Sequence, residues 1–337
     1  MVLAVDEFLK LRASLPLADV RSEKEFGDGH IRHAVNIPIL NNEERRLVGI
    51  DYKEKGQATA IMTGFRLVGP RFHEIIRQAE ELANGKELLV HCWRGGMRSA
   101  NFCKIIGMAN VKTIQLQGGY KSYREKALEF FKLPMNLRIV GGLTGSGKGD
   151  ILRALREKGE QVIDLEHLAA HRGSAFGALK MPPQPTTEQF QNDLFEELMT
   201  FDLTRPIWIE DESVAIGKIF LPLDFWRQMS ASPVYDVSAS DKGARIERLV
   251  REYGDADRTE FLAAMQCITK KLGGQNFKAA KEKLEAGDMA STIDILLTYY
   301  DKAYRAGLEK KKGRIVARVE WNGKDIAKCV DTLLSNY

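Results

Sequence analysis

Leu88 to Ser99, LLVHCWRGGMRS, is the stretch that decides the fold of the first part of the chain. The apolar run Leu88 to Cys92 predicts a buried strand, and Arg98 to Ile106 has the periodicity of a helix. This helix begins directly after a glycine pair, so its positive N-terminal dipole points back at Cys92. A strand, a glycine-rich turn and a helix in this order predict an α/β domain with a mostly parallel sheet.

The sequence around this stretch continues the same pattern. Short apolar runs alternate with amphipathic stretches, and both Leu15 to Val20 and Val111 to Leu116 are predicted strands. The stretch Arg124 to Asn136 ends in Leu133-Pro134-Met135, where a proline interrupts the pattern. We therefore expect a first domain over residues 1–130.

Cys92 is the candidate nucleophile of this domain. The glycines that follow it let backbone amides converge on the thiol, and Arg94 and Arg98 add positive charge. A thiolate is stabilised in such surroundings and faces a pocket for an anion. The alternative is a buried, inert cysteine, but two arginines and two glycines so close behind Cys92 have no packing role. The rest of the predicted anion-binding loop consists of Trp93, Gly95, Gly96, Met97 and Ser99.

This first domain resembles the rhodanese family. The resemblance rests on Leu17-Ala18-Asp19-Val20-Arg21-Ser22 and on the closing motif Leu116-Gln117-Gly118-Gly119-Tyr120. It implies a loop cysteine that carries sulfane sulfur as a persulfide. Five residues separate Cys92 from Arg98, one more than in the family's usual sulfurtransferase loop and as many as in its phosphatases. The larger loop suits a phosphate-like donor, and two chemistries stay open: attack on a chalcogen of a phosphorylated donor, or attack on phosphorus.

A second domain is expected over residues 136–337. Its strand Leu137 to Val140 leads into Gly142-Leu143-Thr144-Gly145-Ser146-Gly147-Lys148 and a helix to about Glu157, the context that indicates a phosphate-binding P-loop. The predicted diphosphate- or nucleotide-binding residues are Gly142, Thr144, Gly145, Ser146, Gly147 and Lys148. Gly149 stands where the motif has a magnesium-binding hydroxyl, which argues against metal-assisted nucleotide hydrolysis.

Two further groups of polar residues are candidates for a second site. One follows the predicted strand Gln161 to Asp164, and the other ends the predicted strand Pro206 to Ile209, as in a Walker B element. The residues are Asp164, Glu166, His171, Arg172 and Ser174 in the first group, and Glu210 and Asp211 in the second. The second pair either holds a cation through water or caps a helix and pairs with arginines. No metal ligand set or tightly bound cofactor is predicted, because the cysteines are scattered.

The remainder of the second domain is predicted to be mostly helical from Lys242 to about Lys311, before a strand from Ile315 to Trp321. The fold class is therefore α/β: a rhodanese-like parallel-sheet domain, then a P-loop NTPase-like α/β domain with a helical C-terminal part.

The whole chain resembles the tRNA 2-selenouridine synthase family. The segments that carry this include the cysteine loop, the P-loop, His171-Arg172-Gly173-Ser174 and Glu210-Asp211-Glu212-Ser213. The resemblance implies that 2-thiouridine at the wobble position of tRNA is converted to 2-selenouridine through S-geranyl-2-thiouridine. The implied co-substrates are geranyl diphosphate, which we assign to the P-loop and Lys148, and selenophosphate, which we assign to the cysteine loop. Cys92 is predicted to carry selenium transfer, while Arg94, Arg98 and the loop amides hold the selenophosphate. An enzyme that supplies selenophosphate is the expected protein partner.

Two other functions stay open at this point. A rhodanese-like phosphatase would explain the spacing from Cys92 to Arg98, and release of phosphate from an aryl phosphate would reveal it. A nucleotide-regulated sulfur carrier would bind nucleotide tightly and leave tRNA nucleosides unchanged.

Composition sets limits on partners and location. The 337 residues carry a net charge of +4, too little to demand a polyanion, and no apolar run is long enough to span a bilayer. With no secretory signal at the N-terminus, a cytoplasmic location is expected, and nothing indicates an oligomeric state. Basic residues of the helical part serve either as tRNA phosphate contacts or as solvated helix faces: Arg245, Arg248, Arg251, Lys270 and Lys271.

Overall fold

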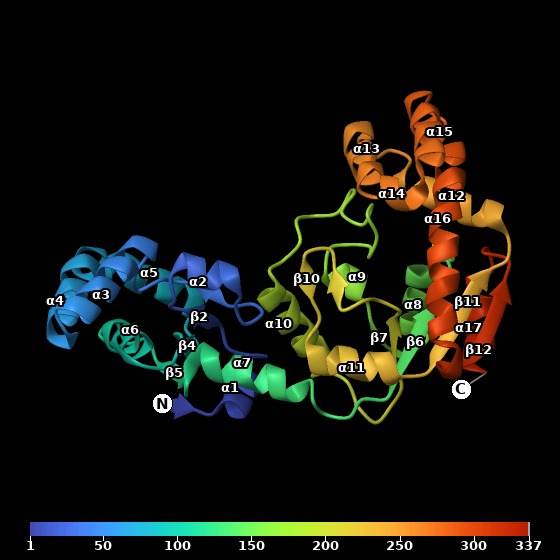
Figure 1. Cartoon of the computed structure of the whole chain (residues 1–337). Coiled ribbons are helices and arrows are strands. Elements are labelled where there is room, and N and C mark those ends of the chain that lie inside the picture. Colours follow the sequence, from blue (N-terminus) through green and yellow to red (C-terminus); the bar gives the residue numbers. More distant parts are fainter. Residues whose placement is uncertain (336–337) are drawn as a thin grey trace. The chain divides into compact units, whose positions relative to one another are not determined.

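A computed structural model describes residues 1–335, and the chain forms two compact units (Figure 1). The first unit ends at Phe130 and the second begins at Phe131. The last two residues of the predicted second domain, 336 and 337, lie outside the described residues.

The first unit is built on a five-stranded parallel sheet with strand order β1-β5-β4-β2-β3. Parallel neighbours require crossover connections, and helices supply them here. The strands are β1 (Val2–Leu3), β2 (Leu17–Asp19), β3 (Val35–Asn36), β4 (Leu88–His91) and β5 (Thr113–Leu116). The helices are α1 (Val5–Leu11), α2 (Glu23–Asp28), α3 (Asn42–Glu54), α4 (Gln57–Val68), α5 (Phe72–Ala83), α6 (Met97–Gly107) and α7 (Gly119–Phe130).

The core of the first unit surrounds β4, the central strand of the sheet. All four residues of β4 are buried, as expected of a strand covered on both faces. Ala18 of β2 and Val90 of β4 pack with Phe102 and Ile106 of α6. This packing fixes the start of α6 next to the end of β4, which is where the cysteine loop lies.

The second unit has its own five-stranded parallel sheet, in the order β12-β11-β6-β8-β7, and a separate hairpin of β9 and β10. The strands are β6 (Leu137–Gly141), β7 (Gln161–Ile163), β8 (Ile207–Glu210), β9 (Ala215–Ile216), β10 (Ile219–Phe220), β11 (Val234–Ala239) and β12 (Ile315–Trp321). The strand β6 lies in the middle of the sheet, so its C-terminal end opens where α/β proteins bind ligands.

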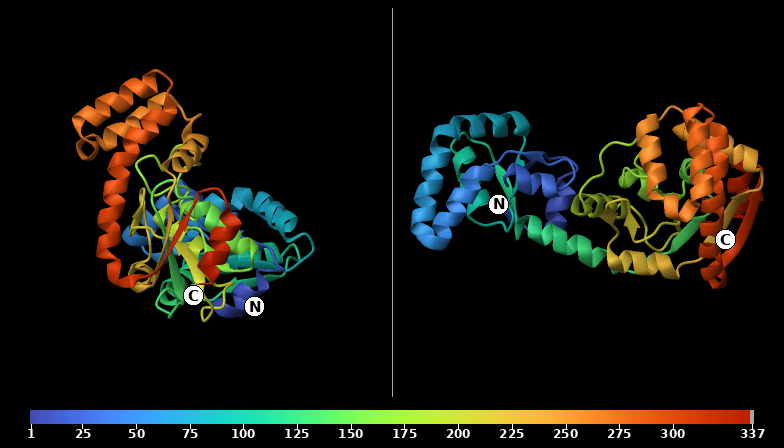
Figure 2. Two further views of the ribbon diagram at one scale, coloured as in Figure 1. Left: turned by 90° about the vertical axis from the view of Figure 1, so that its right-hand side faces the viewer. Right: turned by 45° about the horizontal axis from the view of Figure 1, so that its top comes forward.

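Helices surround this sheet and extend beyond it in a helical part, α13 to α16 (Figures 1 and 2). The helices of the unit are α8 (Lys148–Glu157), α9 (Leu165–Leu168), α10 (Thr187–Leu198), α11 (Leu223–Ala231), α12 (Lys242–Tyr253), α13 (Arg258–Cys267), α14 (Thr269–Leu272), α15 (Gly274–Glu285), α16 (Met289–Lys310) and α17 (Ile326–Leu334). Phe261, Met265 and Leu297 lie in the apolar core of the helical part.

The predicted α/β class with parallel sheets is confirmed in both units. The predicted strands are present but shorter by one or two residues at several ends, for example at β2 and β5. Among the described residues, no helix combines the length and apolarity that crossing a bilayer requires.

Candidate functional site

Cys92 directly follows β4 and is 3 % exposed. Its Sγ lies 3.1 Å from Oγ of Ser99, one turn into α6. Nε2 of Gln115, on the neighbouring strand β5, donates to that hydroxyl at 2.9 Å and to the Gly95 carbonyl at 2.6 Å. The same hydroxyl lies 3.2 Å from the Gly96 carbonyl, to which it donates, so Ser99 links the Cys92 sulfur to the loop backbone and to β5.

The glycine motif after β5 closes against the cysteine loop. Tyr120 N donates to the Cys92 carbonyl at 2.8 Å, and Lys121 N donates to the Trp93 carbonyl at 2.9 Å. Gly119 has a φ of +64°, and a Cβ at this position would lie 2.4 Å from both Cys92 O and Gly95 N. Only glycine fits this close approach, so the motif holds the cysteine loop in place.

Arg98 and Arg94 differ in their surroundings. Nη1 and Nη2 of Arg98 donate to the Glu25 carboxylate at 2.6 and 3.1 Å, and Arg45 Nε contacts the same carboxylate at 2.9 Å. Burial raises the pKa of Glu25, but the hydrogen bonds and charge of Arg98 outweigh it and hold that pKa below its usual value. Arg98 is thus fixed in orientation. Arg94 is exposed, and its guanidinium has no hydrogen-bond or ion-pair partner among the described residues 1–335, so it can close on an anion.

A buried polar network of Asp19, Arg21, His91 and Tyr120 lies next to the cysteine loop. The sequence did not predict this network. Arg21 binds the Asp19 carboxylate through Nε at 3.0 Å and lies 3.8 Å from the centre of the Tyr120 ring. His91 lies 3.6 Å from the same carboxylate, and burial lowers the pKa of its imidazole. The ion pair of Asp19 and Arg21 is buried, and together with His91 and Tyr120 it fixes the strand end that presents Cys92.

The P-loop joins β6 to α8 and has the backbone that phosphate binding requires. Gly145 and Gly147 have φ values of +77° and +80°, and a Cβ on Gly142 would lie 2.4 Å from the Val237 carbonyl. Lys148 Nζ donates to the Gly142 carbonyl at 3.3 Å. Arg248 Nη1 donates to the Gly145 carbonyl at 3.0 Å and so supports the loop from outside. Lys148 and Arg248 contact carbonyls of the loop and not its amides. Ser146 N donates to the Leu143 carbonyl at 2.9 Å, so the glycine amides and Lys148 N are the backbone candidates for an anion.

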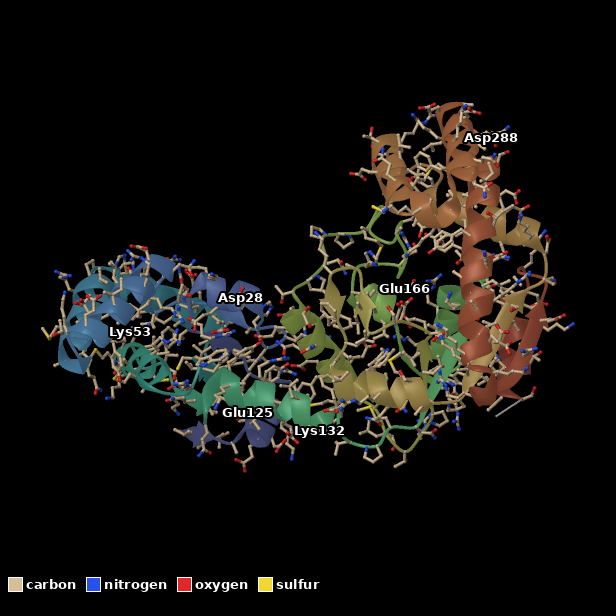
Figure 3. The ribbon with its side chains drawn as sticks, in the orientation of Figure 1. Asp28, Lys53, Glu125, Lys132, Glu166 and Asp288 are labelled. Atoms are coloured by element: carbon tan, nitrogen blue, oxygen red, sulfur yellow. The ribbon has the colours of Figure 1, made fainter. Side chains whose placement is uncertain are left out.

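A cavity of about 440 Å³ opens at the P-loop. Thr144, Lys148 and Gly149 contribute to one wall, and α9 contributes Glu166, which Figure 3 labels. Glu210 and Glu212 complete an acidic wall opposite.

Three glutamates of this cavity, Glu166, Glu210 and Glu212, have raised pKa values and hold protons more tightly than usual. Burial raises the pKa of Glu212 to about 8, and the charge of Glu166 adds to the rise. Burial also raises the pKa of Glu166, and it raises that of Glu210 well above its usual value. Near neutral pH, protonated carboxyl groups therefore lower the negative charge that a bound diphosphate would meet.

The other predicted residues of this region divide into those that line the cavity and those that do not. Arg172, Ser174 and Asp164 line it. His171 does not, because its ring is buried beside Gly177 and accepts a hydrogen bond from Gly173 N at 3.2 Å. His171 therefore shapes the loop and does not face the ligand space.

Glu210 and Asp211 have structural partners. Glu210 Oε1 accepts a hydrogen bond from Glu166 N at 2.6 Å, at the start of α9, and Asp211 forms an ion pair with Lys311. The sequence left two interpretations of this pair open: a cation held through water, or helix capping and pairing with arginines. The contacts agree with the second, except that the basic partner of Asp211 is a lysine. Within residues 1–335 no group of three or more His, Cys, Asp or Glu side chains is placed to hold a metal ion.

Arg245 and Arg248 were predicted as candidate tRNA contacts, and this is wrong. Both are buried: Arg245 binds Asp301 and the Thr144 carbonyl, and Arg248 binds Asp150 as well as Gly145. Their helix α12 turns them toward the P-loop, which sequence periodicity could not show. Other cavity residues that sequence reasoning missed are His167, Glu252, Tyr253 and Tyr300.

Comparisons with known proteins agree with this architecture. Residues 135–335 match the family model described as tRNA 2-selenouridine synthase AAA domain, and residues 4–126 match the rhodanese-like domain. The tRNA 2-selenouridine synthase of Sulfurovum sp. strain NBC37-1 is 33 % identical, over 90 % of this chain and 91 % of that protein. The chain belongs to the tRNA 2-selenouridine synthase family.

Two further relatives carry the same name. The tRNA 2-selenouridine synthase of Shewanella sediminis is 34 % identical over 89 % of this chain and 90 % of that protein. The tRNA 2-selenouridine synthase of Nitrosomonas europaea is 30 % identical over 89 % of this chain and 91 % of that protein. The N-terminal domain of a protein from Clostridium difficile 630 is 37 % identical over 38 % of this chain and 99 % of that structure, with a TM-score of 0.36.

Membership of the tRNA 2-selenouridine synthase family confirms three sequence-based predictions: the family itself, the order of a rhodanese-like domain before a P-loop-type domain, and the assignment as an enzyme. The roles of individual residues stay predictions.

Proposed function

We propose that this enzyme converts 2-thiouridine at the wobble position of tRNA to 2-selenouridine through an S-geranyl intermediate. The observation that carries the proposal is the pairing, in one chain of this family, of a cysteine anion loop with a P-loop cavity that continues into an apolar pocket. The first step uses geranyl diphosphate and the second uses selenophosphate, so two different anion sites are required.

The P-loop cavity suits geranyl diphosphate. Loop amides and Lys148 are available to the diphosphate, and Gly149 is no obstacle because no nucleotide is hydrolysed. A small apolar pocket shares Thr144 and Tyr253 with the cavity and is otherwise lined mainly by apolar side chains such as Phe261 and Leu297. The apolar pocket measures about 40 Å³, so it would take only one end of the geranyl chain, and the rest would lie in the cavity of about 440 Å³. An anion site that adjoins an apolar site supports a prenyl diphosphate as its ligand.

In the geranylation step the thiocarbonyl sulfur of 2-thiouridine attacks C1 of geranyl diphosphate. The C–O bond breaks, diphosphate leaves with the electron pair, and the uracil N3 proton is released. Lys148 and the loop amides stabilise the charge that develops on diphosphate. The proton shared by Glu166 and Glu212 keeps the acidic wall from repelling that charge.

In the selenation step the selenium of selenophosphate attacks C2, and the C–S bond breaks to release geranylthiol. Alkylation makes this possible, since a thioether sulfur leaves more readily than a thiocarbonyl sulfur. The product still carries phosphorus on selenium. Cys92 then attacks the phosphorus, the Se–P bond breaks, and 2-selenouridine leaves; water cleaves the resulting S-phosphocysteine to phosphate.

The electron balance selects attack on phosphorus over attack on selenium. A thiolate that attacked selenium would send the Se–P bonding pair to phosphorus and would leave it reduced. Attack on phosphorus changes no oxidation state, and the long loop from Cys92 to Arg98 offers room for a phosphoryl group. Arg98, held by Glu25, and exposed Arg94 neutralise its oxygens.

Binding of tRNA is proposed to use exposed basic residues. Arg251 of α12 and Lys270 and Lys271 of α14 are exposed and remain candidates for phosphate contacts. Affinity for tRNA should fall steeply with salt, since each neutralised phosphate releases counterions.

The test is mass spectrometry of nucleosides from 2-thiouridine tRNA incubated with the full chain, geranyl diphosphate and selenophosphate. We expect S-geranyl-2-thiouridine with geranyl diphosphate alone and 2-selenouridine with both donors. Unchanged 2-thiouridine under all conditions, with phosphate released from an aryl phosphate, would support the phosphatase instead. Unchanged 2-thiouridine with tight nucleotide binding would support the sulfur carrier.

A further inference from the structure

We infer that an apolar cavity beside the cysteine loop, within the first unit, binds the geranyl chain of S-geranyl-2-thiouridine during selenation. The inference rests on the proposed function and adds a site to it. The site is separate from the apolar pocket at the P-loop, since all residues that line it belong to the first unit.

The cavity lies between a helical hairpin and the start of α6. Its volume is about 130 Å³. The helices α3 and α4 pack against each other and form one side (Figures 1 and 2). Tyr52 of α3, Phe65 of α4 and Met97 and Arg98 of α6 line it.

The lining is apolar and open to solvent. Tyr52 is 55 % exposed, Phe65 is 50 % exposed and Met97 is 49 % exposed. Large apolar side chains gathered at the mouth of a cavity leave apolar area in water, which an apolar ligand would cover. Arg98, whose guanidinium is bound to Glu25, is the one charged residue of the lining.

The cavity adjoins the proposed chemistry directly. Met97 and Arg98 belong both to its wall and to the loop that begins at Cys92. Gln57 Nε2 of α4 donates to Met97 Sδ at 3.7 Å, which ties the hairpin to the loop. A base whose C2 faces the cysteine loop would therefore place a chain on its sulfur at the mouth of this cavity.

The size fits a ten-carbon chain that is partly enclosed. An apolar cavity of about 150 Å³ holds one benzene ring, so roughly six carbons would enter the 130 Å³ cavity here. The others would lie against Tyr52, Phe65 and Met97 at the mouth. This arrangement holds the leaving geranylthiol away from water while the polar base stays outside.

The test uses an anticodon stem-loop RNA prepared with either S-geranyl- or S-dimethylallyl-2-thiouridine, so that geranylation is bypassed. The full chain and selenophosphate are added, and kcat/KM for 2-selenouridine formation is measured for each RNA. Each buried methylene is worth about fourfold in binding. Since part of the chain stays exposed, we expect the wild type to prefer S-geranyl RNA tenfold or more.

Two variants change the cavity and one is a matched control. Phe65→Ala should lower kcat/KM about tenfold for S-geranyl RNA and less than twofold for S-dimethylallyl RNA. Gly64→Leu should likewise lower kcat/KM for S-geranyl RNA and spare S-dimethylallyl RNA. Gly64 lines the cavity, and a Cβ there would meet only Val48 Cγ2, at 4.0 Å, so a leucine side chain can enter the cavity and fill it. Met62→Ala, on the same helix, should leave kcat/KM unchanged for both RNAs, because Met62 is exposed and does not line the cavity.

An unchanged preference for S-geranyl RNA in both cavity variants would overturn the inference. If sedimentation then shows a dimer that Phe65→Ala dissociates, a second copy of the chain covers this surface instead. If the wild type converts neither RNA, the proposed function fails. In that case the cavity is tested by RNA binding, measured as fluorescence anisotropy. The wild type should bind S-geranyl RNA more tightly than S-dimethylallyl RNA, and Phe65→Ala should abolish this difference.

Discussion

Ionisation of the carboxyl pair Glu166 and Glu212 should set the pH dependence of the second unit. Burial raises the pKa of Glu212 from the ordinary 4.5 to about 8, and the charge of Glu166 adds to this rise. A raised pKa in the folded state means that the folded unit binds the proton more tightly than the unfolded chain. The stability that this provides is complete below pH 4.5 and is lost as the pH rises through about 8.

The magnitude follows from the shift. Each tenfold step in proton affinity is worth about 1.4 kcal/mol, so ionising Glu212 costs the folded unit on the order of 5 kcal/mol. Glu212→Gln keeps the shape and removes the titration. The variant should match the wild type near pH 5 and exceed its free energy of unfolding by a few kcal/mol at pH 9.

Guanidinium denaturation followed by tryptophan fluorescence is a suitable assay, because three of the four tryptophans, Trp208, Trp226 and Trp321, lie in the second unit. We expect wild-type stability to fall between about pH 4.5 and about pH 8 and the Glu212→Gln curve to be flatter over that range. Equal slopes for the two proteins would refute it. Diphosphate affinity, measured by calorimetry, should weaken as the pH rises through about 8, since ionised Glu212 repels the ligand.

Three further predictions concern the loops. Gly119→Ala should lower selenation at least a hundredfold and spare geranylation, because the new Cβ would meet Cys92 O and the glycine has a φ of +64°; normal selenation of an S-geranyl RNA would contradict this. Arg248→Ala should destabilise the second unit by about 3–5 kcal/mol in denaturant, because a buried ion pair is broken; a change below about 1 kcal/mol would show that the arginine is dispensable. Gly149→Ser should fold normally, since a Cβ meets only Arg153 Nη1 at 3.7 Å, and should make diphosphate binding respond to Mg²⁺; calorimetry with and without Mg²⁺ checks it, and an unchanged response would contradict the role given to the missing hydroxyl.

The elements next to the two loops were predictable from sequence because their signals are local. A strand, a glycine turn and a helix define the P-loop, and α8 spans the predicted Lys148–Glu157. The strand Ile315–Trp321 was predicted to the residue, since its apolar and polar residues alternate between charged segments.

Contacts between distant segments were not predictable. Asp211 and Lys311 form an ion pair across 100 residues, and Arg248 reaches the P-loop from a helix that looked solvated. Periodicity places a side chain on a helix face but does not say what that face packs against. The hairpin of α3 and α4 carries no motif, so the cavity beside Cys92 emerged only from the fold.

The division of labour between the two sites is the central claim, and matched variants test it most directly. Cys92→Ser and Lys148→Ala are incubated with 2-thiouridine tRNA and both donors, and the nucleosides are quantified by mass spectrometry. Cys92→Ser should consume 2-thiouridine and S-geranyl-2-thiouridine but stop at the adduct that still carries phosphorus on selenium, without 2-selenouridine. Lys148→Ala should leave 2-thiouridine unreacted yet convert an RNA that is already S-geranylated. Equal loss of both steps in each variant would contradict the account.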